Sequence, residues 1–525
     1  MNCSSPRSFN KQKEYSSSAA LTPKLSRNQR REAREEYTKM RLTQAILVAL
    51  VAGVANCQET VLGVYIFSRH GDRTAKSTPP ANLTDLGYEE VFTSGTYFRN
   101  RYIAEGASSK IYGMNTDLVL EAQITVSAPL DTVLQNSALA FTQGLYPPVG
   151  PILGANTLRN GTVVQSPLNG YQLIPVQLVS NGAGSEDSAW LEGAQNCANA
   201  QISSNSYFST PEYMSTLNKT QSFYNGVAPM INRTFTAQQT SYANAYTIFD
   251  LLNVASIHNS SDDFPSAQLL TPDTFFQLRT LADQHEFNLA YNQSEPIRAM
   301  TGTVIASQVL QALNGTITGK GENKLNVQFG AYAGMLSFFG LAGLLQVNPD
   351  FYGVPDYAST LTWELVTNAT VSSTSFPSAD EISVRFLFHN GTTSNISEPT
   401  VYPLFGQSET VLAWNDFITG MNKFAVGGQA QWCNLCGNST GVCSPSVIGS
   451  NSSSSSPGTT SSSNSSGGGI SKAVAGVIGA MVTLAVILGA EILIMLVAGL
   501  RLVSKKRLAG GSPGGTAGGS TTVKA

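Results

Sequence analysis

Three basic side chains stand close together in the chain, and their types and spacing suit phosphate chemistry. Arg69, His70 and Arg73 belong to the segment Ser-Arg-His-Gly-Asp-Arg-Thr at residues 68–74. An arginine guanidinium is a planar fork of N–H donors that matches phosphate oxygens, and an imidazole beside it can attack phosphorus. The alternative is a surface turn in which these residues meet by chance. The scarcity of basic residues argues against it, because residues 58–471 hold only 15 Lys and Arg.

An apolar run leads directly into this segment and must position it. Residues 60–67 read Thr-Val-Leu-Gly-Val-Tyr-Ile-Phe, a composition that predicts a strand buried on both faces of a sheet. Gly71 then allows the backbone to turn sharply. Ligands of open α/β sheets bind at the carboxyl ends of the strands. The sequence therefore predicts an anion site at one edge of a sheet.

These residues resemble the histidine acid phosphatase family, which is the acid phosphatase and phytase branch of the histidine phosphatase superfamily. The family pattern after the first strand is Arg-His-Gly-x-Arg-x-Pro, and here Ala75 stands in place of Pro. Residues 83–87, Leu-Thr-Asp-Leu-Gly, look like the family's entry to a long helix. The resemblance implies that His70 is the phosphorylated nucleophile and that Arg69 and Arg73 hold the phosphate. It extends over residues 60–443 and suggests a fungal-type, membrane-anchored member.

The family's other signatures are reduced in this chain. A second signature is a strand that ends in His-Asp, whose His contacts the phosphate and whose acid protonates the leaving group. Residues 383–389 end in His389, the phosphate-contact candidate, but Asn390 follows where the acid belongs. General-acid help is worth about 10²–10⁴ in rate, so Asp72 is considered as a substitute donor. A third signature, a phosphate-binding Arg near a helix start, is missing from residues 126–138.

The resemblance also implies the fold. We expect a three-layer α/β sandwich with a mixed sheet and a mostly helical cap at about residues 200–345. Within the cap, residues 242–252, 275–290 and 300–313 look helical. His258 is expected in an exposed loop and His285 on the surface of a helix.

Composition excludes several classes of protein. With 42% hydrophobic residues the chain is not wholly disordered, and a net charge of −3 argues against nucleic-acid binding. No spacing of His and Cys predicts a metal site, no glycine pattern predicts a nucleotide, and no cofactor is expected. The charge is unevenly distributed along the chain. Residues 58–471 carry a net charge of −14, and the segments before and after them are basic.

Charge and hydropathy together predict a secreted, membrane-anchored organisation. The apolar run 42–54 suits a signal peptide, with a type II anchor as the alternative. Residues 470–503 are long enough to span a bilayer and are followed by Lys505, Lys506 and Arg507. The chain is therefore expected at the cell surface as a single-pass type I protein. The expected parts are an upstream extension or long leader (1–39), a signal peptide (40–57), an ectodomain (58–443), a disordered stalk (444–469), a transmembrane helix (470–503) and a cytoplasmic tail (504–525).

Cysteines and sequons agree with this compartment. Cys197, Cys433, Cys436 and Cys443 suggest two disulfides with three possible connectivities. Asn-x-Ser/Thr sequons are dense in the ectodomain, which predicts a glycoprotein. One of them begins at Asn390, and a glycan there would crowd a site built on His389.

Three functions remain open from the sequence, and the third is a wall-spanning structural protein, which the stalk and tail fit equally well. The first is an extracellular phosphomonoester hydrolase that acts through a phosphohistidine on His70. The second keeps the fold without efficient turnover, as a surface glycoprotein that binds an anionic ligand or serves the cell wall. The expected partners are a small phosphomonoester or other anion, and a membrane.

Overall fold

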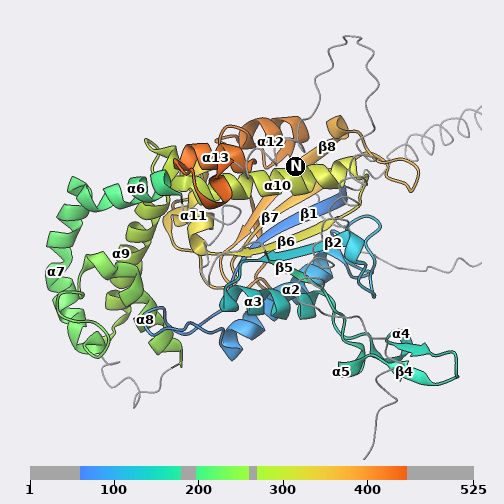
Figure 1. Cartoon of the computed structure of the whole chain (residues 1–525), viewed down its shortest axis with the longest axis horizontal. Coiled ribbons are helices and arrows are strands. Elements are labelled where there is room, and N and C mark those ends of the chain that lie inside the picture. Colours follow the sequence, from blue (N-terminus) through green and yellow to red (C-terminus); the bar gives the residue numbers. More distant parts are fainter. Residues whose placement is uncertain (1–58, 179–196, 259–268, 446–525) are drawn as a thin grey trace, which may run out of the picture. The chain divides into compact units, whose positions relative to one another are not determined.

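The computed structural model describes residues 59–178, 197–258 and 269–445. Their main sheet has the strand order β10-β8-β7-β1-β6-β2-β5, with β9 paired to β8. β1, β6, β2 and β5 run parallel, whereas β7 is antiparallel to both β1 and β8. The expected mixed α/β sheet is therefore confirmed (Figure 1). The strands are β1 Thr60–Arg69, β2 Ile124–Ala128, β3 Ala155–Thr157, β4 Val163–Gln165, β5 Val176–Leu178, β6 Leu325–Gly330, β7 Thr360–Thr367, β8 Ile382–His389, β9 Thr400–Tyr402 and β10 Val411–Ala413.

Helices cover both faces of the sheet. In Figure 1, α2 and α3 lie on one side of it, and α10 and α12 lie on the other. The described helices are α2 Asp85–Tyr102, α3 Thr132–Leu145, α4 Gly150–Leu153, α5 Pro167–Gly170, α6 Ala198–Ser206, α7 Pro211–Ile231, α8 Ala245–His258, α9 Pro272–Ala290, α10 Met300–Thr318, α11 Tyr332–Leu341, α12 Trp414–Met421 and α13 Gln429–Cys436.

The central strand β1 contributes side chains to two separate hydrophobic cores. Val64 and Ile66 pack into a core with α2 and α3, whereas Tyr65 and Phe67 pack into a larger core that reaches the helical part. Alternate side chains of a strand point to opposite faces of a sheet. A strand covered on both faces needs an apolar residue at almost every position, which explains the uninterrupted run at residues 60–67.

A group of helices, called the helical part below, lies beside one end of the sheet. It contains α6, α7, α8 and α9 (Figure 1), and the three stretches expected to be helical are helical. The range expected for the cap also contains β6, which pairs with β1 inside the main sheet.

The predicted membrane organisation falls on other parts of the chain. Within residues 59–178, 197–258 and 269–445, no helix is both long enough and apolar enough to cross a bilayer. The predicted signal peptide at 40–57, the stalk from 446 onward and the span at 470–503 lie outside the described residues.

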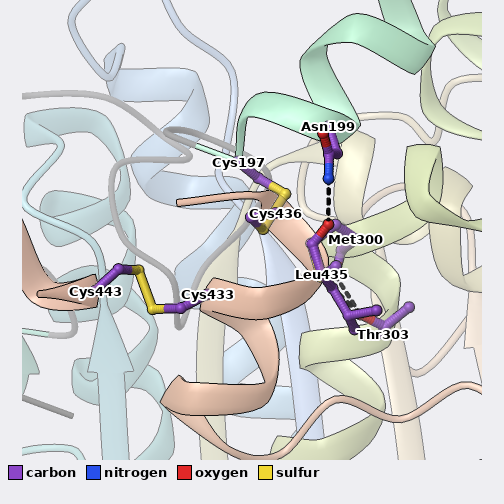
Figure 2. The surroundings of a disulfide bond; sticks show 8 residues. All are labelled: Cys197, Asn199, Met300, Thr303, Cys433, Leu435, Cys436 and Cys443. Atoms are coloured by element: carbon purple, nitrogen blue, oxygen red, sulfur yellow. Dashed lines mark hydrogen bonds between the residues drawn. A yellow bond between two sulfur atoms is a disulfide. The ribbon is translucent and has the colours of Figure 1, made fainter. Parts of the chain in front are cut away.

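Both expected disulfides are present (Figure 2). Cys197 bonds to Cys436, and Cys433 bonds to Cys443. The four sulfurs lie in a small apolar core with Trp432. Through the first bond, the C-terminal helix α13 is fixed to α6, 239 residues away in the sequence.

Candidate active site

The segment that follows β1 packs closely against the start of α2, and a glycine on each side makes this contact possible. Thr84 caps α2, because its side chain accepts a hydrogen bond from Gly87 N at 3.1 Å. A Cβ on Gly71 would lie 2.2 Å from Gly87 O, and a Cβ on Gly87 would lie 2.0 Å from Asp72 O. Neither position admits a side chain without backbone movement. The Leu-Thr-Asp-Leu-Gly motif thus both starts the helix and seats the segment that carries the reactive residues.

His70 is fully buried, with 0% exposure. Its Nδ1 lies 2.7 Å from the carbonyl oxygen of Gly71. Since a carbonyl oxygen can only accept, Nδ1 must carry the proton, and the lone pair of the neutral ring is then on Nε2. The ring packs against Tyr357 at a centroid distance of 5.6 Å. This tautomer is the one that a nucleophile attacking through Nε2 requires.

Arg69 is buried among tyrosines. Its guanidinium donates to Pro355 O and, at 3.3 Å, to the Tyr246 hydroxyl. It also lies over the rings of Tyr332 and Tyr357, at 5.1 Å and 4.6 Å from their centroids. The buried Arg69 Nε has no hydrogen-bond partner among the described residues. The side chain therefore keeps an unused donor for a ligand oxygen.

Arg73 already has an anionic partner inside the protein. One of its terminal nitrogens lies 3.0 Å from the carboxylate of Asp250 on α8, and the two side chains are 0% and 3% exposed. Asp250 also accepts from Lys76 N at 2.8 Å. The carboxylate thus neutralises the cation that was expected to hold a phosphate. Nothing in the sequence around Asp250 signals this pairing, since 177 residues separate the partners.

A cavity of about 270 Å³ opens next to Arg69. Aromatic rings and polar groups share its walls, and its charged residues are two arginines and three acids. These are Arg69, Arg279, Glu90, Asp250 and Asp356. Arg279 is itself paired with Asp356 at 2.8 Å and with Asp283 at 3.2 Å. The acids of the cavity wall thus outnumber its arginines, so the wall has no surplus of basic groups.

Asp72, which the sequence analysis considers as a proton donor, is fully buried, and its carboxylate already contacts two side chains. Its Oδ2 accepts from the Thr84 hydroxyl and lies 2.6 Å from His258 Nε2. The expectation that His258 lies in a loop is wrong, because it is the last residue of α8. Its expected exposure is confirmed, although its ring contacts the buried Asp72. His285, expected on the surface, is buried on α9 beside Glu286.

Glu90 on α2 is a residue that sequence reasoning missed. Its Oε2 accepts a hydrogen bond from Asp72 N at 2.7 Å, and the side chain lines the cavity of Arg69. Burial raises the pKa of the Glu90 carboxyl to about 7, although the hydrogen bond from Asp72 N opposes this shift and the Asp72 charge adds to it. A carboxyl that lines a cavity and has a pKa near 7 is a candidate for proton transfer at neutral pH.

His389 and Asn390 lie at the expected edge of the sheet but not in this cavity. Across the sheet, Ser68 pairs with Thr360 and Thr360 pairs with His389. Two strand spacings, about 10 Å, therefore separate β8 from β1. His389 lines a neighbouring cavity with Asn390, and burial lowers the pKa of its imidazole. Of the residues predicted for the site, Arg69 lines this cavity, and His389 and Asn390 line the neighbouring one. His70, Asp72 and Arg73 are buried in the same segment as Arg69 and do not line the cavity.

Lys76 is a further basic residue near the motif, with its Nζ 5.8 Å and 5.3 Å from the ring centroids of Tyr246 and Tyr332. Among the described residues, the end of β6 and the start of α3 add no basic group. β6, the parallel neighbour of β1, ends in Gly330 and is followed by Ala331 and Tyr332, which offer neither an imidazole nor a carboxyl. The helix α3 has no Arg in its first turn, and Asp131 caps it by accepting from Leu134 N at 3.0 Å. Tyr332 instead supplies one of the rings against Arg69.

Comparison with known proteins identifies the family of this chain. The sequence model of the histidine phosphatase superfamily (branch 2) matches residues 79–389, which is more than half of the chain. The chain belongs to this family. The family assignment made from the sequence is thereby confirmed, and it supports a phosphatase-type hydrolase. The matched region begins just after the segment that holds His70.

Solved structures with a similar fold include three enzymes. The phytase of Citrobacter braakii is 15% identical and has a TM-score of 0.48, with 72% of this chain and 99% of that chain covered. The phytase of D. castellii is 13% identical and has a TM-score of 0.45, with 73% and 82% covered. The multiple inositol polyphosphate phosphatase of Bifidobacterium longum, in complex with phosphate, is 13% identical and has a TM-score of 0.41, with 71% and 94% covered. No curated protein sequence matches the chain.

Proposed function

We propose that this protein hydrolyses phosphomonoesters of small uncharged alcohols through a phosphohistidine on His70. His70 Nε2 attacks phosphorus, and the bond between phosphorus and the leaving oxygen breaks with its electron pair going to that oxygen. The leaving oxygen takes up a proton and departs as the alcohol. Water then attacks the phosphohistidine, which releases inorganic phosphate and regenerates the imidazole.

The tautomer of His70 is the observation that carries this proposal. The hydrogen bond from Nδ1 to Gly71 O orients the ring and assigns the lone pair to Nε2. A nucleophile needs such a second group to hold it in place. Arg69 stands next to His70 with a buried donor, Nε, that no described residue uses, and this donor suits an oxygen of the transferred phosphoryl group.

The charges of the cavity support a restriction on the substrate. Glu90, Asp250 and Asp356 line the same space as Arg69, so a leaving group with further phosphates would meet carboxylates. Tyr246, Phe249 and Tyr357 line it as well, and these rings suit an uncharged leaving group with an apolar face. Aryl and simple alkyl monophosphates are therefore favoured over inositol polyphosphates.

Slow turnover is expected, because one phosphate-binding arginine is paired with an internal carboxylate and the usual acid is replaced by an amide. The Arg73–Asp250 ion pair competes with phosphate for the guanidinium, and Asn390 has no proton to give. These two features also favour the second candidate, a binding protein of the same fold that does not turn over. Binding of phosphate without any phosphohistidine would be its signature.

We also propose that the protein acts at the cell surface as a membrane-anchored glycoprotein. The two disulfides support an oxidising compartment. Ten sequon asparagines lie in the described residues, and each is at least partly exposed, as glycan attachment requires. They are Asn82, Asn160, Asn218, Asn232, Asn292, Asn314, Asn368, Asn390, Asn395 and Asn438.

The test compares three substrates on the purified full-length chain and on its His70→Ala variant. We expect slow hydrolysis of an aryl phosphate, slower hydrolysis of glycerol phosphate and little release of phosphate from phytate. The variant should lose the aryl phosphatase activity by at least a factor of about 10³. Equal activity in the variant would contradict the mechanism, and a preference for phytate would contradict the substrate class.

A further inference from the structure

We propose that the Glu90 carboxyl is the proton donor to the leaving group, in place of the acid that Asn390 lacks. The inference rests on the proposed function, because it assigns a role within that reaction. It goes beyond that function by assigning proton transfer to α2, the first helix after β1 in the described chain, and not to the residue that follows β8.

Glu90 reaches the reactive segment directly. Its Oε2 accepts from the backbone N–H of Asp72 at 2.7 Å, and Asp72 is separated from His70 only by Gly71. The same side chain lines the cavity that Arg69 lines. The carboxyl is thus fixed at one oxygen, close to the nucleophile, and borders the space where a leaving group would sit.

The other acids around the cavity are committed to cations. Asp250 pairs with Arg73 at 3.0 Å, and Asp356 pairs with Arg279 at 2.8 Å. Asp72 is held by Thr84 and His258 and does not line the cavity. Among the described residues, Glu90 is the acid of the cavity wall that forms no ion pair.

The surroundings of Glu90 raise its pKa, so that a share of the carboxyl is protonated at neutral pH. Burial is the largest cause of the raised pKa of this carboxyl, and the charges of Asp72 and Asp356 add to it. The hydrogen bond from Asp72 N and the charge of Arg69 act in the opposite direction. The net result is a pKa of about 7, which is close to the optimum for an acid that works at neutral pH.

The proton balance closes within one cycle. When the bond from phosphorus to the leaving oxygen breaks, that oxygen takes the proton of Glu90 and leaves as the neutral alcohol. The Glu90 carboxylate then accepts a proton from the water that attacks the phosphohistidine. Inorganic phosphate departs, and both His70 and the Glu90 acid are restored.

The experiment uses Glu90→Gln in the full-length chain, with Glu89→Gln as the matched control. Glu89 is the preceding residue of α2 and is exposed. The substrates are glycerol phosphate, whose alkoxide needs a proton to leave, and 2,4-dinitrophenyl phosphate, whose phenolate does not. We expect Glu90→Gln to lower kcat/KM on glycerol phosphate by about 10²–10⁴ and to change kcat/KM on the dinitrophenyl ester by less than about threefold, because kcat/KM does not include the later hydrolysis of the phosphohistidine, which both substrates share.

The pH profile provides an independent readout. On glycerol phosphate, kcat of the wild type should fall as pH rises through about 7, and Glu90→Gln should lose this limb. Equal losses on both substrates would assign Glu90 a structural role and overturn the inference. Glu90→Asp, which keeps a carboxyl, should recover part of the glycerol phosphate activity. It serves as the second variant if the Gln variant does not fold.

Failure of the proposed function looks different from failure of this inference. If the wild type forms no phosphohistidine from 2,4-dinitrophenyl phosphate, the hydrolase itself is excluded, and Glu90 as its donor with it. If the phosphohistidine forms and Glu90→Gln keeps the full rate on glycerol phosphate, the hydrolase stands and Glu90 is not the donor.

Discussion

The buried ion pair of Arg73 and Asp250 leads to the sharpest prediction. Asp250→Asn keeps the shape of the side chain and removes its charge. Arg73, whose side chain is buried at 0% exposure, then loses the carboxylate of Asp250, and a bound anion can take the place of that carboxylate. We therefore expect a variant that is less stable alone and more strongly stabilised by phosphate-like anions than the wild type.

The magnitude follows from the geometry. Two unit charges 3.0 Å apart attract each other by about 5 kcal/mol at an effective dielectric constant of roughly 20. Removing one partner of a buried pair typically costs about 3–5 kcal/mol. An anion at 100 times its dissociation constant returns about 2.7 kcal/mol through binding to the folded state. Most of the loss should therefore be recovered with tungstate or phosphate present.

The assay is urea unfolding of the wild type and the variant, with and without tungstate. Asp117→Asn, an exposed aspartate, is the control for loss of one negative charge. A double variant, Arg73→Met with Asp250→Leu, should lose the additional stabilisation by the anion. Unchanged stability of Asp250→Asn, or equal stabilisation of all variants by tungstate, would refute the assignment of Asp250 as an internal substitute for phosphate.

Three further predictions concern Glu90, Gly87 and Asn390. Because the pKa of Glu90 rises from 4.5 to about 7 on folding, the folded state binds more protons between these values. The wild type should lose up to about 3 kcal/mol of stability as pH rises from 4.5 to 8, and Glu90→Gln should lack this slope in urea unfolding. Gly87→Ala would place a Cβ 2.0 Å from Asp72 O; it should cost at least about 1–3 kcal/mol in the same assay, and an unchanged midpoint would contradict the close approach. Asn390→Asp should not raise kcat on glycerol phosphate, because position 390 lines the neighbouring cavity and not the one that Arg69 lines; a gain of tenfold or more would return the donor role to this position.

Local sequence predicted the elements that carry the motif. The apolar run before Arg69 gave a strand covered on both faces, and the Thr84 cap marked the start of α2. Both signals depend on residues close together in the chain, so they are readable without a fold. The close approach of Gly71 and Gly87 follows from the same motif, but only the structure shows that the two glycines face each other.

The partners of the basic residues could not be predicted in this way. Asp250, Tyr246 and Tyr357 reach Arg69 and Arg73 from distant segments, and a sequence gives no distance between such segments. The position of His389 illustrates the same limit. Its strand runs in the same direction as β1 and ends at the same edge, yet β7 lies between them.

The most direct test of the proposed function is a search for the phosphohistidine itself. The full-length chain is incubated with 2,4-dinitrophenyl phosphate, quenched at alkaline pH and digested for mass spectrometry. The account predicts one phosphoryl group on His70 in the wild type and none in His70→Ala. Phosphate release without modification of His70, or equal release by both proteins, would contradict it.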